Sequence, residues 1–384
     1  MTSRERVLTT IAHTEPDRVP LDFGATMETT IHLKAYAMLK EKLHILTDKE
    51  AGIKLLTAQF ADVDQEIQEK IGADVRGVQP VPPANFEIRY EKKGEYTQFT
   101  DEFGISWRKS DEDGLYFDMF KHPLAEMELE DIENYPFPDP REPSRFAGLS
   151  ERIDTLSADG EFPIVFDNCW GNGIFQMCNQ MMGYDQFLIA MALGEKKADY
   201  MLDKILDLKM NFWDEVLERF GDRIDIVKEL DDLGTQINLL LSPEMYQDKI
   251  KPRLTKLVNS IKKKAPHVKM MMHSCGSIRK VIPDLIDAGV EILNPIQYTA
   301  EDMDPATLKK EFGKDLTFWG GGMETQKIMP MGTVQEVKDE TRRQLDILMP
   351  GGGFVFAQVH SLQWGVPFEN MMAMWETVKE YGSY

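Results

Sequence analysis

Short apolar runs alternate with helical patterns along the chain, and this alternation limits the fold more than any other feature. Eight runs have the length and apolar content of buried strands. They cover residues 19–23, 74–78, 162–166, 224–228, 268–272, 291–294, 316–319 and 354–357. Strands that alternate with helices pair in parallel, so eight such units predict a closed (β/α)8 TIM barrel of the α/β class. An open, doubly wound sheet is the alternative.

Helical patterns separate most of these runs. They cover residues 31–43, 197–219, 243–264, 278–288, 333–348 and 368–381. Thr333 and Glu336 have the spacing of a capping box ahead of one helix. Ser242 followed by Pro243 predicts an N-cap and a first-turn proline at another. These signals place helix starts where the alternation needs them.

One block interrupts the alternation. Residues 86–119 alternate apolar and polar positions and contain Lys-Gly and Asp-Gly turn signals. The pattern predicts a small antiparallel β insertion in the N-terminal third of the barrel. The proline-rich segment 137–143 is expected to lead back to the barrel as a surface connection. Residues 1–384 are therefore expected to form a single domain.

Charge and cysteine content exclude several classes of function. The chain has 44 Lys and Arg against 65 Asp and Glu, a formal charge of −21, and no long basic run for nucleic acid or an anionic membrane. No uncharged apolar stretch approaches the roughly 18 residues of a membrane span, and no secretory signal is expected. Three cysteines make no disulfide framework, which is typical of the cytoplasm, and Cys169 is expected in the core. Nucleotide-binding and serine-hydrolase motifs are missing.

The stretch HSCG, residues 273–276, ends the fifth expected strand. Residues i and i+2 of a strand point to the same side, so His273 and Cys275 are expected to present an imidazole and a thiol together. In a parallel barrel this position is the C-terminal mouth, where active sites lie. The two groups form a borderline-soft pair suited to zinc. A packed histidine beside a buried thiol is the alternative, because two ligands do not complete a site.

His360 follows the last expected strand, which lies not far across the mouth from the fifth. Together, His273, Cys275 and His360 would make a three-ligand catalytic zinc site with an open position. A loop histidine with an ordinary hydrogen bond is the alternative for His360.

Three carboxylates follow the fourth expected strand in the stretch ELDDLG. Glu229 and Asp231 are candidates for a fourth ligand, for orienting a ligating histidine, or for carrying a proton. The alternative is that Asp232 caps the following segment and that the other two are solvated charges.

Four further residues are weaker candidates for binding substrate. Asp22, Gln297 and Glu324 each fall within a few residues of the carboxyl end of an expected strand. His32 begins the first expected helix and would line the rim of the pocket, although a surface histidine is the alternative.

Six segments spread over nearly the whole chain carry a family resemblance. They are RERVLTTIAHTEPDRVPLDFG, DEFGISWRK, HPLAEMELEDIENYPFPDP, DDLGTQINLLLSPEMYQDKIKPR, HSCGSIRKVIPDLIDAGVEILNPIQ and PGGGFVFAQVHSLQWGVPFENMMAM. They resemble the uroporphyrinogen decarboxylase superfamily, and the resemblance implies a (β/α)8 barrel. The decarboxylases of the family carry an arginine-rich signature of the R-x-A-G-R type near the N-terminus. The equivalent stretch here, VPLDFGATMETT, has no arginine, so decarboxylation of a porphyrinogen is not expected.

The other branch of the superfamily consists of zinc-dependent methyltransferases that work with corrinoid proteins. In its coenzyme M methyltransferases, an H-x-C pair and a later cysteine after the final strand hold the zinc. His273 and Cys275 match the pair, and His360 stands at the position of the later cysteine. This departure argues against coenzyme M and favours another methyl donor or acceptor, such as an aryl methyl ether.

The resemblance therefore implies a zinc-dependent methyltransferase that moves a methyl group from a small methylated molecule to a corrinoid protein. Its cofactors would be Zn²⁺ on this chain and cobalamin on the partner protein. The alternatives are a decarboxylase-like lyase acting on a smaller acid and a non-catalytic partner of a corrinoid protein. An acidic barrel of this size is often a dimer, so a homodimer is also expected.

Overall fold

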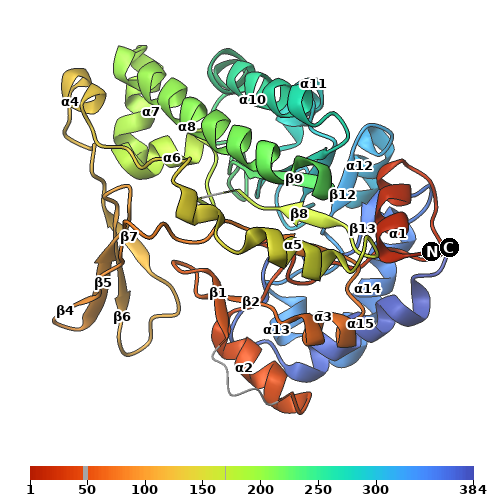
Figure 1. Cartoon of the computed structure of the whole chain (residues 1–384). Helices are drawn as coiled ribbons and strands as arrows, with labels where there is room; N and C mark the ends of the chain where they lie inside the picture. Colours follow the sequence, from red (N-terminus) through yellow and green to blue (C-terminus); the bar gives the residue numbers. More distant parts are fainter. Residues whose placement is uncertain (46–50, 169) are drawn as a thin grey trace.

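A curled sheet of parallel strands, with helices packed around its outer face, forms the framework of the molecule (Figure 1). The computed structural model describes residues 1–45, 51–168 and 170–384, so Cys169 lies outside the described residues. Within them the sheet has seven strands in the order β13-β12-β11-β10-β9-β8-β3. Their bounds are β3 Arg76–Val78, β8 Ile164–Phe166, β9 Ile226–Leu230, β10 Lys269–His273, β11 Ile292–Asn294, β12 Thr317–Trp319 and β13 Phe354–Val355.

The sheet is barrel-like, but the expected closure through an eighth strand at residues 19–23 is wrong. Leu21 makes only an isolated parallel bridge with Phe356. The Leu21 carbonyl accepts a hydrogen bond from the Asp74 N–H (2.7 Å), and the Pro20 carbonyl accepts one from the Phe356 N–H (2.8 Å). The segment therefore lies between the two edges of the sheet. Because Pro20 has no N–H to donate, it cannot extend these contacts into a regular ladder.

The helices confirm the expected alternation. The six expected helical segments correspond to α2, α8, α9 with α10, α11, α14 and α15. The segment 243–264 is divided by a π-helical turn at Tyr246–Ile250. The capping box at Thr333 and the N-cap at Ser242 are both present. Among the described residues, no helix combines the length and the apolar character needed to cross a membrane.

The bounds of the helices in chain order are α1 Ser3–Ile11, α2 Leu33–Lys42, α3 Gln65–Ile71, α4 Leu129–Glu133, α5 Leu149–Ser157, α6 Ile174–Met182, α7 Tyr184–Leu193, α8 Lys196–Phe220, α9 Pro243–Met245, α10 Lys251–Lys264, α11 Ile282–Asp287, α12 Pro305–Phe312, α13 Ile328–Met331, α14 Val334–Leu348 and α15 Phe368–Tyr381.

The antiparallel insertion is present, as the alternating block predicted. Its strands pair in the order β4-β5-β6-β7, and they stand to one side of the parallel sheet in Figure 1. A separate hairpin, β1 with β2, lies earlier in the chain. The Phe117 N–H donates to the Thr57 carbonyl (2.8 Å), which joins the insertion to the turn of that hairpin. The bounds are β1 Gly52–Leu55, β2 Phe60–Asp62, β4 Glu91–Lys93, β5 Tyr96–Thr100, β6 Ser106–Ser110 and β7 Asp118–Lys121.

Two apolar layers show which way each strand residue points. Met271 belongs to the inner layer enclosed by the sheet, with one residue from most of the other strands. Met270 and Met272 belong to the outer layer between sheet and helices. Because side chains alternate along a strand, His273 points to the inside, as Met271 does. This alternation decides which of the predicted site residues reach the mouth.

Candidate metal centre

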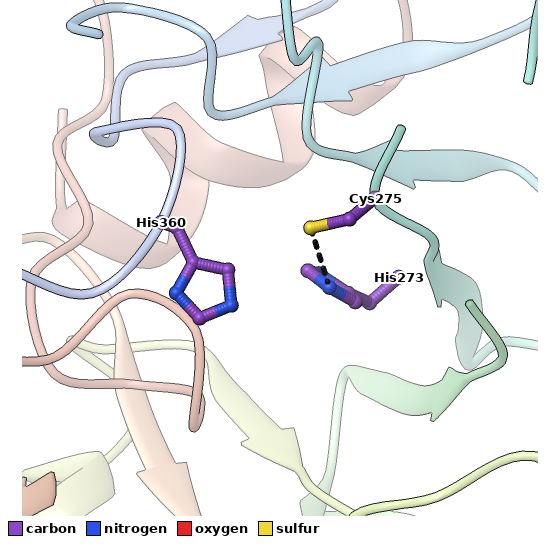
Figure 2. A group of neighbouring side chains, drawn as sticks. All are labelled: His273, Cys275 and His360. Atoms are coloured by element: carbon purple, nitrogen blue, oxygen red, sulfur yellow. Dashed lines mark hydrogen bonds between the residues drawn. The ribbon is translucent and has the colours of Figure 1, made fainter. Parts of the chain in front are cut away.

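The three predicted ligands meet at the carboxyl end of the sheet. Figure 2 shows His273 and Cys275 side by side at the end of β10, with His360 facing them from the loop after β13. The Cys275 Sγ atom lies 3.3 Å from His273 Nε2. One ligand atom from each of the three residues lies within 4.8 Å of the other two.

The donor set fits zinc. Two imidazole nitrogens and one sulfur are the ligands that zinc prefers among the divalent ions. Nitrogen and sulfur ligands that share a tetrahedral zinc lie roughly 3.3–3.8 Å apart at its usual bond lengths. The distance of 3.3 Å between His273 Nε2 and Cys275 Sγ agrees with this spacing. His360 would complete three ligands and leave a fourth position open.

The neighbouring strand orients the His273 ring. The register of β10 and β11 pairs His273 with Asn294, whose Oδ1 lies 2.5 Å from His273 Nδ1. The Asn294 Nδ2 group donates to the Trp319 carbonyl (2.6 Å), so Oδ1 is the atom that accepts from His273. His273 therefore carries its proton on Nδ1 and presents the Nε2 lone pair to the other two ligands.

Burial controls the protonation of the other two ligands. Desolvation, together with the nearby His273, lowers the pKa of His360 to about 4, so its imidazole is neutral at neutral pH and free to ligate. Burial also raises the pKa of the Cys275 thiol well above its usual range, and the carboxylates of Asp232 and Glu28 add to that effect. A cation beside the sulfur is what would favour the thiolate.

A buried ion network lies close to the two imidazoles. Lys228 is fully buried, and its Nζ atom is 2.6 Å from Glu28 Oε2 and 2.9 Å from Asp167 Oδ1. Burial alone would lower the pKa of Lys228, but the two carboxylates outweigh burial and raise it. The sequence analysis missed this network. A lysine inside the apolar run IDIVK was its one visible signal.

Two of the predicted carboxylates do not reach the ligands. Glu229 points outward from β9, where it accepts hydrogen bonds from Lys209 Nζ (2.6 Å) and Trp213 Nε1 (2.5 Å) of α8. Asp231 points the same way and accepts from two backbone N–H groups in the first turn of α6 (2.9 and 2.7 Å). Burial raises the pKa of Asp231 to about 7. Residues two apart on a strand point to the same side, so Asp231 points outward as Glu229 does.

Asp232 is instead the carboxylate of this stretch that faces the ligands. Its Oδ1 atom accepts from the Cys275 N–H (3.0 Å) and lies 3.7 Å from His273 Nε2. The sequence predicted a cap at Asp232. Asp232 does accept a backbone hydrogen bond, but the donor is Cys275, in the segment that carries the candidate ligands.

Asp22 and His32 have structural partners and do not line the cavities around the ligands. Asp22 is buried and accepts a hydrogen bond from Trp319 Nε1 (2.8 Å), and burial raises its pKa to about 6. His32 is the N-cap of α2, where its Nδ1 atom accepts from the Lys34 N–H (3.2 Å).

Gln297 and Glu324 line a cavity of about 210 Å³ together with Cys275 and His360. The Gln297 Oε1 atom accepts from the Gly276 N–H (2.8 Å). Gly276 has φ +89°, and a Cβ there would lie 2.6 Å from a backbone carbon of Gly234. Only glycine fits this turn, which carries the chain away directly after Cys275.

A larger cavity of about 410 Å³ opens on the two imidazoles, His273 and His360. Its wall is shared between the barrel and the antiparallel insertion, which contributes residues between 101 and 117. A volume of this size is typical of a site for a small molecule.

One solved structure supports the architecture. A methyltransferase from Methanosarcina mazei matches with a TM-score of 0.67 at 16% identity, covering 99% of each chain. Xylanase 10B from Thermotoga maritima matches with a TM-score of 0.40 at 10% identity, covering 61% of this chain and 80% of the xylanase. No curated protein sequence matches this chain. The family model for uroporphyrinogen decarboxylase (URO-D) matches residues 118–381. The chain therefore belongs to the uroporphyrinogen decarboxylase family.

Proposed function

We propose that this protein is a zinc-dependent methyltransferase. It would move a methyl group from a small methylated molecule, such as an aryl methyl ether, to a corrinoid protein. The observation that carries the proposal is the meeting of His273, Cys275 and His360 at an open cavity. Membership of the family, and a fold shared with the methyltransferase from Methanosarcina mazei, support it.

The chemistry follows from what the donor set would hold. When bound, zinc supplies Lewis acidity that stabilises negative charge developing on an ether or alcohol oxygen, and it equally suits a thiolate acceptor. The chain's own residues prepare that position. Asn294 aims His273 Nε2, and burial keeps His360 neutral. Asp232 lies beside the ligands, where its carboxylate can take or return a proton.

The acceptor in this proposal is a corrinoid carried by a second protein. The large cavity would hold the donor with its methoxy group toward the two imidazoles. Aromatic side chains on the cavity wall keep water away from the reacting bond.

The test combines metal analysis with turnover. Purified wild-type protein is expected to contain one zinc per chain and to methylate an added corrinoid protein from a methoxylated arene. His273→Ala and Cys275→Ser should lose both the zinc and the turnover. His44→Asn is the matched control, because His44 is exposed and has φ +57°, a conformation that asparagine tolerates.

Three results would overturn the proposal. Wild-type protein without stoichiometric zinc would remove its basis. Turnover that persists undiminished in a chelator would favour a metal-free lyase. Corrinoid-protein binding that survives His273→Ala, with no turnover from any methyl donor, would point to a non-catalytic partner.

A further inference from the structure

The composition of the large cavity restricts the charge of what it binds. Six aromatic side chains line it, namely Phe60, Phe103, Trp107, Tyr116, Phe117 and Trp170. Four carboxylates also line it, namely Glu28, Asp101, Glu102 and Asp232. Among the described residues that form the lining there is no lysine or arginine.

Two of the four carboxylates are neutralised from behind the wall. Glu28 pairs with the buried Lys228 (2.6 Å), and Glu102 pairs with Arg145. The two basic groups next to these carboxylates are therefore already paired. Lys109, which lies over the Phe117 ring, is not among the lining residues.

Within the described residues, the other two carboxylates lack a lysine or arginine partner. Within the described part of the chain, no lysine or arginine lies within 4.0 Å of Asp101 or Asp232. Asp101 is held by the N–H groups of Phe103 (2.9 Å) and Ile105 (3.0 Å) and by Trp107 Nε1 (2.8 Å). Burial raises the pKa of Asp101 to about 6, so it is still mainly ionised above pH 7.

The two tryptophans of the wall present ring surface without a free polar group. Trp107 donates its indole N–H to Asp101, and Trp170 donates its own to Glu102 (3.1 Å). The Phe103 and Trp170 rings meet edge to face with centroids 5.2 Å apart. The rings are therefore fixed, and their remaining surface suits a flat apolar ligand.

We propose that this cavity accepts uncharged methoxylated arenes and rejects methoxylated aromatic carboxylates, with Asp101 as the residue that sets this selection. An anion would enter an apolar enclosure beside Asp101, and among the described lining residues no lysine or arginine would offset it; zinc on the three ligands is the one cation of this account, and the metal-depleted sample removes it. An organic cation would meet aromatic ring faces and the same carboxylate, so the cavity does not select against it. The inference rests on the proposed function only in that the bound arene is the methyl donor.

Three ligands of one shape test the selection. They are 4-methoxybenzyl alcohol (neutral), 4-methoxybenzoate (anionic) and 4-methoxybenzylamine (cationic), titrated at pH 7.5 by calorimetry or tryptophan fluorescence. The zinc-loaded protein is used, and a metal-depleted sample removes any contact between the benzoate and zinc. The alcohol is expected to bind at least tenfold more tightly than the benzoate in both samples, and the amine is expected to bind at least as tightly as the alcohol.

Substitutions assign the selection to Asp101. Asp101→Asn should reduce the preference for alcohol over benzoate at least threefold. Glu112→Gln, an exposed acid of the same insertion, should leave the preference unchanged. Thermal unfolding of each variant shows whether it is folded.

The outcomes separate this inference from the proposed function. Equal or tighter binding of the benzoate, weaker binding of the amine than of the alcohol, no binding of the alcohol, or an unchanged preference in the folded Asp101→Asn variant would overturn the inference. Selective binding of the alcohol without methyl transfer to any corrinoid protein would support the selection and contradict the proposed function instead.

Discussion

The carboxyl edge of the parallel sheet and the antiparallel insertion face each other across one cavity, but they hold their side chains in different ways. At the sheet edge, His273 is aimed by Asn294 of the next strand, 21 residues away in the chain. In the insertion, Trp107 is held by Asp101, only six residues away. Long-range register sets the first arrangement and local turns set the second.

This difference indicates that the residues that would bind the metal and the residues that select the bound arene can be changed separately. The candidate ligand His273 depends on the register of β10, which cannot shift without moving the neighbouring strands. Four of the six aromatic wall residues, Phe103, Trp107, Tyr116 and Phe117, lie in a segment that pairs mainly with itself, so they can change while the candidate ligands stay in place. Each prediction below changes one region, and the first measures the effect on both.

Removal of a ligand should give the largest effect and should be confined to the sheet edge. We expect His360→Ala to weaken zinc binding by much more than about 100-fold. That figure is the upper range for substitutions of residues that only orient a metal ligand. Binding of 4-methoxybenzyl alcohol should change less than about threefold, because most of the wall remains. Competition with a chelating dye measures the first quantity and calorimetry the second. A parallel loss of arene binding would contradict the separation.

Loss of Glu229 should destabilise the fold without touching the metal. The ion pair with Lys209 is buried, so Glu229→Ala leaves an uncompensated ammonium and should lower the free energy of unfolding by about 3–5 kcal/mol. Urea unfolding measures this change. Zinc content per folded chain should equal that of wild type, and loss of zinc in the folded variant would show that Glu229 serves the site after all.

Asn294→Ala should have an intermediate effect at the sheet edge. His273 would lose the acceptor that fixes its ring, and outer partners of this kind change metal affinity by about 10–100-fold. Asn134→Ala serves as the control, because Asn134 is an exposed helix cap far along the chain. Unchanged zinc affinity in a folded Asn294→Ala protein would show that the register of β10 and β11 does not orient the ligand.

The smallest expected effect is a pH dependence in the insertion. Burial raises the folded-state pKa of Asp101 to about 6, above its unfolded value, so the folded state favours the protonated form. Relative to Asp101→Asn, wild type should be most stable below pH 4 and should lose stability as the pH rises to about 6, by no more than about 1.4 kcal/mol per pH unit. Urea unfolding at pH 4, 5, 6 and 7 measures the difference. If the difference in unfolding free energy between wild type and Asp101→Asn did not change with pH, the raised pKa of Asp101 would be contradicted.

Seven of the eight predicted strands and the insertion are present, because apolar periodicity and turn residues are local signals. Closure through residues 19–23 failed because an apolar run does not report the hydrogen bonds that Pro20 cannot make. The same limit applies to Glu229 and Asp231. A run of carboxylates after a strand indicates the correct edge of the sheet. Which of them faces the candidate ligands depends on which side chains of β9 point inward, and the structure shows that Asp232 does.

Other parts of the site needed pairing information that one sequence does not carry. The spacing of His273 and Cys275 placed both on one side of a strand, and strand order brought His360 close to them. Asn294 became visible only through its register with His273, and the aromatic wall only through the fold of the insertion over the mouth.

The most direct test of the central claim is zinc-edge X-ray absorption of the loaded full-length protein. The account predicts a first shell that contains one sulfur at about 2.3 Å and two imidazole nitrogens at about 2.0–2.1 Å. Cys275→Ser should remove the sulfur contribution. A shell of oxygen and nitrogen alone in the wild-type protein would contradict the account.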